Sequence, residues 1–337
     1  MALLTGPLPL IPPKNQAQNG GSDTSVVALG GGHGLYASLS ALRLLTSDLT
    51  AVVTVADDGG SSGKLRDELG VLPPGDLRMA LSALCDDTDW GRTWRDVMQH
   101  RFQSKPGRNS SLDQHAMGNL LIVTLWELLG NTVDGLRWAG ALLGARGQVL
   151  PMASVPLTIQ GRSRKTAEDG TETTHRIAGQ SVLATAGMVE DVRLLPENAA
   201  ACVEALEAIE LADWVVLGPG SWYTSVLPHL LLPELRQALC NTPAKRCLAM
   251  NLDVNDKEAE GMSAADHLRV ISKYAPEFGG DVVRADPTSV GDRDEFEAAA
   301  TALGAEVVLT RVRASNKQAV HDPLRLAAAF HDVFAGT

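Results

Sequence analysis

Short apolar runs alternate along the chain with glycine-rich turns and with segments of helical spacing. Residues 26–29 form such a run, which ends at a glycine cluster and is followed by a helix-like pattern over residues 35–45. The order of strand, glycine turn and helix returns around residues 214–221. Strands separated by helices in this way pair in parallel and are covered by helices on both faces, so the pattern predicts an α/β fold with a doubly wound, mainly parallel sheet. Further strands are predicted at 49–55, 247–252, 281–285 and 306–312, and helices at 77–84, 94–102, 115–129, 199–209 and 323–334.

Residues 151–195 interrupt this pattern. A stretch of β-branched alternation at 155–159 and another alternating stretch at 188–194 flank a polar turn at 168–171, which predicts a small antiparallel β insertion. We expect residues 24–334 to form a single domain that carries this insertion. Residues 1–23 hold an apolar patch that is interrupted by prolines and has no basic segment before it, so we expect a disordered tail and no signal peptide.

The composition and charge of the chain indicate which classes of partner it is expected to bind. Its 337 residues carry a formal net charge of −11, with 45% hydrophobic and 20% charged residues, which is typical of a globular protein. Because duplex binding needs several basic contacts to phosphates, the acidic balance argues against a nucleic-acid duplex as partner. The most apolar stretch, residues 120–129, is short and contains Glu127, so no membrane span is predicted. The four cysteines lack paired metal or redox spacing, and we expect a cytoplasmic protein.

The first candidate binding feature is the loop of Gly30, Gly31, Gly32, His33 and Gly34 between a predicted strand and a predicted helix. Glycines there let backbone N–H groups approach an anion at the positive end of the helix, and phosphate is the natural ligand. The spacing is not the GxGxxG of dinucleotide-binding folds. A tight turn that needs positive φ is the structural alternative.

The second candidate feature is residues 57–66, just past the carboxyl end of the next predicted strand, where doubly wound sheets bind ligands. Its polar residues are Asp57, Asp58, Ser61, Ser62, Lys64 and Arg66. Asp57 or Asp58 could accept ribose hydroxyls or hold a divalent ion, while the two cations offset phosphate charge. The run is not a Walker A loop, because the residue after Lys64 is Leu65. A capped turn with solvated charges is the alternative.

Three further segments lie at comparable positions in the pattern. They contribute Asp76, Arg78, His115, Asn119, Gly218, Gly220 and Ser221 as candidate ligand-binding residues. Taken singly, each has a structural reading, such as a helix N-cap for Asp76. No nucleophile elbow, HExxH or paired CxxC is present, so no catalytic residue is predicted.

Together these motifs resemble the YvcK-type gluconeogenesis factors, which are related to the CofD transferases. The resemblance rests on residues 54–66, 73–78, 218–225 and 264–267, on the first glycine loop, and on His115 with residues 118–120. It implies a Rossmann-like fold and a cytoplasmic protein needed for cell shape and cell-wall homeostasis on gluconeogenic carbon sources. It also implies binding of UDP-sugars such as UDP-N-acetylglucosamine, with no established reaction.

Carried over residue by residue, the resemblance makes residues 30–34 and 218–221 two diphosphate cradles, with Asp57, Asp76 and Asn119 lining the same crevice. One departure is Met262, which stands where many relatives have tyrosine and removes an aromatic ring from the ligand's surroundings. We therefore expect a change in affinity or sugar preference.

Three functional hypotheses follow. The first is a regulatory protein that binds a UDP-sugar without turnover, with a homodimer and a cell-wall regulatory partner left open. The second is a CofD-like transferase in which Asp57 or Asp58 holds magnesium against a nucleotide diphosphate. The third is a nicotinamide-dependent oxidoreductase, which the glycine spacing disfavours.

Overall fold

The computed structural model describes residues 24–166, 172–187, 189–253, 259, 261–315 and 319–336. A seven-stranded sheet has the order β10-β9-β8-β7-β1-β2-β3, with every neighbouring pair parallel. The predicted doubly wound α/β class is confirmed, whereas the predicted disordered tail, residues 1–23, lies outside the described residues. The strands are β1 (Val26–Gly30), β2 (Leu49–Val53), β3 (Gln148–Pro151), β7 (Trp214–Leu217), β8 (Lys245–Ala249), β9 (Val282–Ala285) and β10 (Glu306–Leu309).

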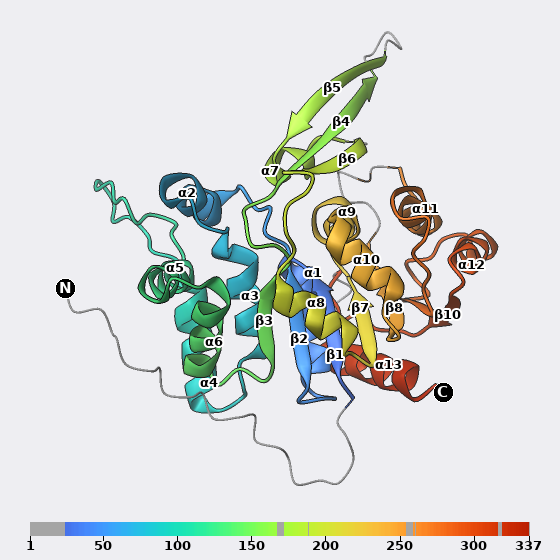
Figure 1. Ribbon diagram of the computed structural model, residues 1–337, viewed down its shortest axis with the longest axis horizontal. Helices are drawn as coiled ribbons and strands as arrows, with labels where there is room; N and C mark the ends of the chain where they lie inside the picture. Colours follow the sequence, from blue (N-terminus) through green and yellow to red (C-terminus); the bar gives the residue numbers. More distant parts are fainter. Residues whose placement is uncertain are drawn as a thin grey trace.

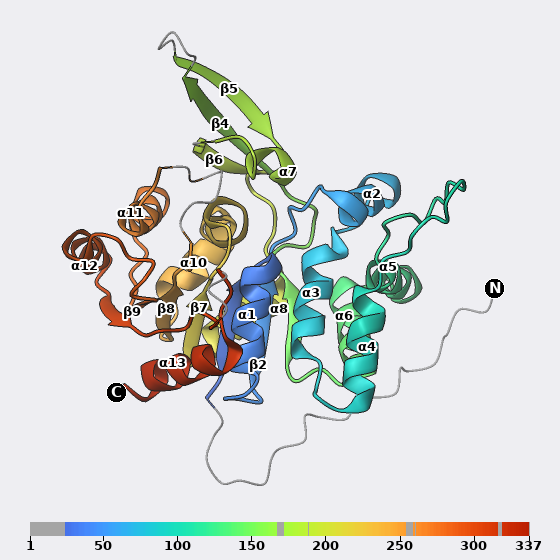
Figure 2. The ribbon, with the colours of Figure 1, turned by 180° about the vertical axis from the view of Figure 1, so that it is seen from behind.

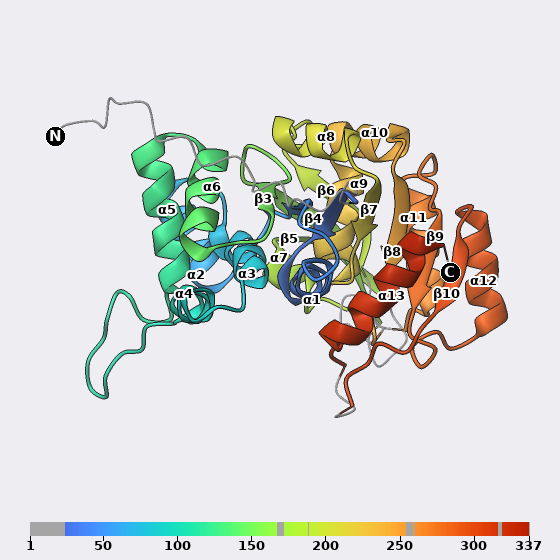
Figure 3. The same cartoon turned by 90° about the horizontal axis from the view of Figure 1, so that it is seen from below.

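Helices cover both faces of this sheet. Figure 3 shows α1 and α13 along one face and α8 and α10 along the opposite face. The helices are α1 (Gly32–Leu42), α2 (Gly60–Leu69), α3 (Pro74–Leu84), α4 (Asp89–Gln99), α5 (Met117–Leu129), α6 (Thr132–Leu143), α7 (Gln180–Leu183), α8 (Val203–Glu210), α9 (Leu227–Leu231), α10 (Pro233–Asn241), α11 (Ala264–Tyr274), α12 (Arg293–Ala302) and α13 (Pro323–Ala335), with a π-helical turn, η1 (Trp222–Val226), before α9.

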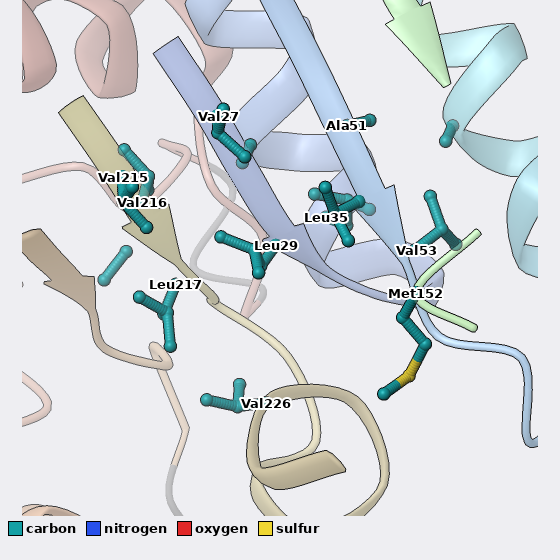
Figure 4. Packing of buried hydrophobic residues seen from close by; sticks show 14 of the residues in the cluster. Val27, Leu29, Leu35, Ala51, Val53, Met152, Val215, Val216, Leu217 and Val226 are labelled. Atoms are coloured by element: carbon teal, nitrogen blue, oxygen red, sulfur yellow. The ribbon is translucent and has the colours of Figure 1, made fainter. Parts of the chain in front are cut away.

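The core lies on both sides of β1, β2 and β7. All residues of these three strands are buried, which explains why their sequences are nearly continuous apolar runs without alternation, with Thr50 as a buried polar exception. Figure 4 shows Leu29 and Leu217 of neighbouring strands together with Leu35 from α1. Because burial of a leucine side chain contributes roughly 1.5–3 kcal/mol, this packing fixes the ends of β1 and β7 relative to each other.

The predicted antiparallel insertion forms a second sheet of the order β5-β4-β6. Its strands are β4 (Thr158–Thr166), β5 (Glu172–Ala178) and β6 (Val189–Leu195), and they stand out from one end of the body (Figures 1 and 2). Ile159 and Leu194 bury one face of this sheet, and the backbone N–H of Val192 donates to the Tyr274 hydroxyl of α11 at 2.8 Å. The insertion is thus packed against the body at its base.

Several boundaries differ from the predicted ones. The first helix begins at Gly32 and not at residue 35, because the glycine loop itself supplies the first turn of α1. The helix predicted at 94–102 is α4, which begins at Asp89 after Thr88 accepts a hydrogen bond from the Gly91 amide as N-cap. The pattern does not predict α2, because its buried face is made largely of serine and glycine.

Candidate functional site

The main candidate site lies in the crevice at the topological switch point. β1 lies between β2 and β7. The chain continues from β1 to β2 and β3 on one side of the sheet and later forms β7 on the other side of β1, so the strand order reverses at β1. In such sheets ligands bind beyond the carboxyl ends of the strands at this point. A cavity of about 760 Å³ opens at this place, within the range of small-molecule sites. Six of the predicted residues line it: Gly31, Gly32, His33, Gly34, Gly220 and Ser221.

The two glycine loops touch through their backbones. A Cβ atom on Gly34 would lie 2.1 Å from the Pro219 carbonyl oxygen, and one on Gly31 would lie 2.3 Å from Thr54 Oγ1. Gly32 has φ +56° and open space around its missing side chain. Glycine at these positions therefore permits close packing and leaves the first turn of α1 open toward the cavity, where orphan N–H groups can bind an anion.

Asp76 connects the first glycine loop to the end of β2. Its carboxylate accepts a hydrogen bond from Thr54 Oγ1 at 3.2 Å and another from the Gly32 amide. Burial, assisted by the charge of Asp57, raises the pKa of Asp76 to about 6. This carboxylate therefore stabilises the conformation of the first glycine loop, and it can bind a proton near neutral pH.

Asp57 and Asp58 have different surroundings. Asp57 accepts from the Gly59 amide at 2.9 Å, and burial raises its pKa above the ordinary value. Asp58 accepts from the Ser181 amide at 2.9 Å and thereby holds the start of α7 in the insertion. Of the two predicted metal candidates, only Asp57 is thus free of the insertion and electrostatically coupled to Asp76.

The donors for a magnesium ion are few but suitable. Within the described parts of the chain, no cluster of three or more His, Cys, Asp or Glu side chains could hold a metal ion. Mg²⁺ is commonly bound by only one or two carboxylates together with phosphate and water. Asp57 and Asp76 would be the carboxylates available to an ion that arrives with a diphosphate, and neither is among the described residues that line the cavity.

Four of the predicted residues form an internal network. Ser61 Oγ lies 3.2 Å from His115 Nδ1 and accepts from Asn119 Nδ2 at 3.0 Å. Arg78 Nε donates to Asn119 Oδ1 at 2.9 Å, and burial lowers the pKa of Arg78 to about 10. Ser62 Oγ separately accepts from the Gly75 amide at 3.0 Å. The network joins α2, α3 and α5 beside the crevice, and ligand contact by its members stays a prediction.

The two predicted cations of α2, Arg66 and Lys64, have different surroundings. Arg66 donates from Nη1 to the Leu157 carbonyl at 2.7 Å and from Nη2 to Thr158 Oγ1 at 2.8 Å. Its guanidinium therefore links α2 to the first residues of the insertion. Lys64 is exposed. Neither is among the residues that line the cavity in the described structure.

Sequence reasoning missed several polar residues that line the cavity, among them Asn251, Gln180 and His321. Asn251 accepts from the Gly220 amide at 2.8 Å and donates to the Gly220 carbonyl at 2.9 Å, so it fixes the second glycine loop. Its position past the carboxyl end of β8 could have identified it. Gln180 of α7 and His321 before α13 also line the cavity, and no sequence pattern distinguishes them.

Met262 contacts an aromatic ring from η1. The Tyr223 hydroxyl donates to Met262 Sδ at 3.6 Å, and Met262 is not among the described residues that line the cavity. The effect of this departure on affinity stays a prediction.

This chain is similar to a known protein family and to named relatives along most of its length. Residues 26–323 match the profile of the family described as 2-phospho-L-lactate transferase CofD. A protein of Mycobacterium leprae that is provisionally named a gluconeogenesis factor is 47% identical over 324 residues, which cover 94% of this chain and 88% of that protein. The gluconeogenesis factor of Halalkalibacterium halodurans is 39% identical over 251 residues, which cover 74% of this chain and 73% of the relative.

A solved structure shares the whole architecture. The crystal structure of a UPF0052-family protein from Bacillus halodurans has a TM-score of 0.78 and 32% sequence identity to this chain, and the match covers 93% of this chain and 100% of the other. In the described part of the present chain, no helix has the length and apolar character needed to cross a membrane.

Proposed function

Because this chain belongs to the CofD family and is a homologue of the gluconeogenesis factors, we propose that it is a nucleotide-sugar-binding regulatory protein whose ligand is a UDP-sugar such as UDP-N-acetylglucosamine. The observation that carries the proposal is the meeting of two glycine loops at the switch point, around a cavity of about 760 Å³. A diphosphate suits this place because backbone N–H groups and a helix N-terminus favour negative charge.

The proposal extends to the biological role implied by the family resemblance. We propose that the bound nucleotide sugar is a signal in the cytoplasm that supports cell shape and cell-wall homeostasis during growth on gluconeogenic carbon sources. Such a signal would be read by a protein partner or by a second copy of the chain.

A binding experiment with recovery of the ligand tests this function. The purified protein is titrated calorimetrically with UDP-N-acetylglucosamine, UDP-glucose, NAD and GDP, with and without magnesium, and the nucleotides are then separated by chromatography. Saturable, selective binding of a UDP-sugar that is recovered intact supports the regulatory function. Failure of every UDP-sugar to bind rejects it.

The second candidate function is a magnesium-dependent transferase. The coupled carboxylates Asp57 and Asp76 behind the glycine loop favour it, since they can provide oxygen ligands for an ion that neutralises a diphosphate leaving group. In that role the two residues would position the ion, and the loop amides would bind the phosphates. Magnesium-dependent release of UDP from a UDP-sugar would establish this function, and its absence with a bound, intact ligand would exclude it for that substrate.

A further inference from the structure

Two residues that line the cavity each have a hydrogen-bond acceptor without a partner. Gln180 Oε1 and His321 Nε2 are buried from solvent and receive no hydrogen bond from any residue that the structure describes. Both residues line the cavity that contains the glycine loops. An unsatisfied buried acceptor costs roughly 1–3 kcal/mol, so each atom is expected to have a partner in the working protein.

The hydrogen bond of the His321 ring defines which of its nitrogens accepts. The ring is hydrogen bonded to the Met250 backbone carbonyl, which can only accept, and the unpartnered atom is Nε2. Nδ1 is therefore the nitrogen that carries the proton. Burial, together with the nearby Arg284 charge, lowers the pKa of His321 to about 4, so the ring is neutral at physiological pH and Nε2 has a free lone pair.

Gln180 lines the cavity from a different part of the fold than His321. It begins α7 in the insertion, and the Ser181 amide beside it is fixed by Asp58 at 2.9 Å. His321 precedes α13, which packs along α1 on the body. The two acceptors thus belong to separate walls, and a ligand that satisfies both must present hydrogen-bond donors in two directions.

This requirement separates the parts of a nucleotide sugar. The diphosphate has no donors at neutral pH, a uracil ring linked through its glycosidic nitrogen has a single N–H donor, and the ribose has two hydroxyl donors that lie side by side on one edge of its ring. A pyranose has several hydroxyl donors around its ring. Resting on the proposed function, we propose that Gln180 Oε1 and His321 Nε2 accept hydrogen bonds from hydroxyl groups of the sugar and so make the site prefer a UDP-sugar over UDP.

Variants that remove each acceptor test this assignment. Gln180→Met keeps the length of the side chain, and His321→Phe keeps a ring, but neither keeps the acceptor. The full-length protein is titrated calorimetrically with UDP-N-acetylglucosamine, UDP-glucose and UDP. We expect each variant to bind the two UDP-sugars about three- to tenfold more weakly, with UDP affinity within about twofold of the wild type.

Matched controls separate recognition from folding. Gln103→Met and His331→Phe make the same exchanges at exposed positions and should leave all three affinities unchanged. His321→Gln restores an acceptor and should recover most of the sugar affinity, which a purely structural role would not predict. If either acceptor-deleting variant fails to fold, this comparison is made with Gln180→Ala and His321→Leu.

The outcomes distinguish this proposal from the proposed function. Equal weakening of UDP and UDP-sugars would overturn the assignment by placing the two acceptors at the nucleoside. Unchanged affinity for every ligand would overturn it by showing that these atoms do not contact the ligand. If the wild-type protein binds UDP but no better when a sugar is attached, the assignment is wrong, and if it binds no uridine nucleotide at all, the proposed function itself is rejected.

Discussion

Gly34 packs its backbone directly against Pro219, so that a Cβ atom at Gly34 would lie 2.1 Å from the Pro219 carbonyl oxygen. This contact joins the first turn of α1 to the loop after β7, and it sets the separation of the two loops that we propose to bind a diphosphate. A methyl group cannot be accommodated there without movement of one loop, because the atom that it would meet belongs to the backbone.

Gly34→Ala is therefore expected to separate the two loops. We predict destabilisation by about 1–3 kcal/mol, the range of overpacking, and loss of most UDP-sugar affinity. Gly140→Ala in α6 is the matched control, since its Cβ would have ordinary contacts of 3.6 Å to Leu81 and 3.7 Å to Ala145. The control should be neutral or stabilised by up to about 1 kcal/mol in urea unfolding. Wild-type stability and affinity in Gly34→Ala would contradict the close approach.

Gly32 provides a test of the charge preference of the cavity. Its φ of +56° is tolerated by aspartate and asparagine, and nothing lies within 4 Å of its missing side chain. Gly32→Asp and Gly32→Asn therefore share shape and backbone strain but differ by one negative charge. We predict that the aspartate variant binds UDP-sugars at least about tenfold more weakly than the asparagine variant, because its carboxylate repels the diphosphate. Equal affinities by calorimetry would argue against an anion at this loop.

Asp76 is expected to make stability depend on pH. Its folded-state pKa of about 6 lies above the unfolded value near 3.9, so the folded state binds more protons between about pH 4 and 6. The free energy of unfolding should therefore fall as pH rises through this window and remain lower above it. We expect the free energy of unfolding to fall by about 2 kcal/mol across this window. This is less than the energy that corresponds to the full pKa shift, because Asp76 retains some contact with solvent.

Asp76→Asn should remove this pH dependence while its amide oxygen still accepts from Thr54 and Gly32. Urea unfolding of both proteins at pH 4, 5, 6 and 7 measures the difference, with the exposed substitution Asp67→Asn as control. A pH profile that is the same in Asp76→Asn and the wild type would show that Asp76 does not cause it.

The sequence predicts the parts of this protein that depend on local pattern. Buried strands such as β7 appear as continuous apolar runs, and glycine loops between strand and helix mark the edge of the sheet where we propose that an anion binds. Neither pattern predicts the position of the switch point. That position depends on the pairing of β7 with β1, and β7 does not pair with the strand that precedes it in the chain. Gln180 and His321 likewise reach the cavity through tertiary packing, which no local spacing encodes.

The predicted binding residues show the same limit. Asp57 and Asp58 are adjacent in sequence and were indistinguishable as ligands, yet only the folded chain directs Asp58 to the Ser181 amide of the insertion. Arg66, expected near phosphate, donates to Leu157 and Thr158. Long polar side chains can reach several partners, so the pattern identifies their edge of the sheet but not their contacts.

The Arg66 contacts make the insertion dependent on α2. Arg66→Ala removes two hydrogen bonds from a charged donor, each worth about 1.5–3 kcal/mol, at the point where the chain enters β4. We predict that amide hydrogen exchange in β4, β5 and α7 becomes roughly tenfold faster or more, while β1, β2 and β7 keep wild-type exchange. Lys64→Ala, an exposed position in the same helix, should change neither.

The same variant links the insertion to ligand recognition. Because α7 carries Gln180, loosening its attachment should weaken binding of UDP-sugars more than binding of UDP. Arg66→Lys should restore only part of the effect, since an ammonium group cannot reproduce the two-pronged contact with Leu157 and Thr158. Faster exchange in the insertion without a change in UDP-sugar affinity would separate the two roles and place sugar recognition on the body of the protein.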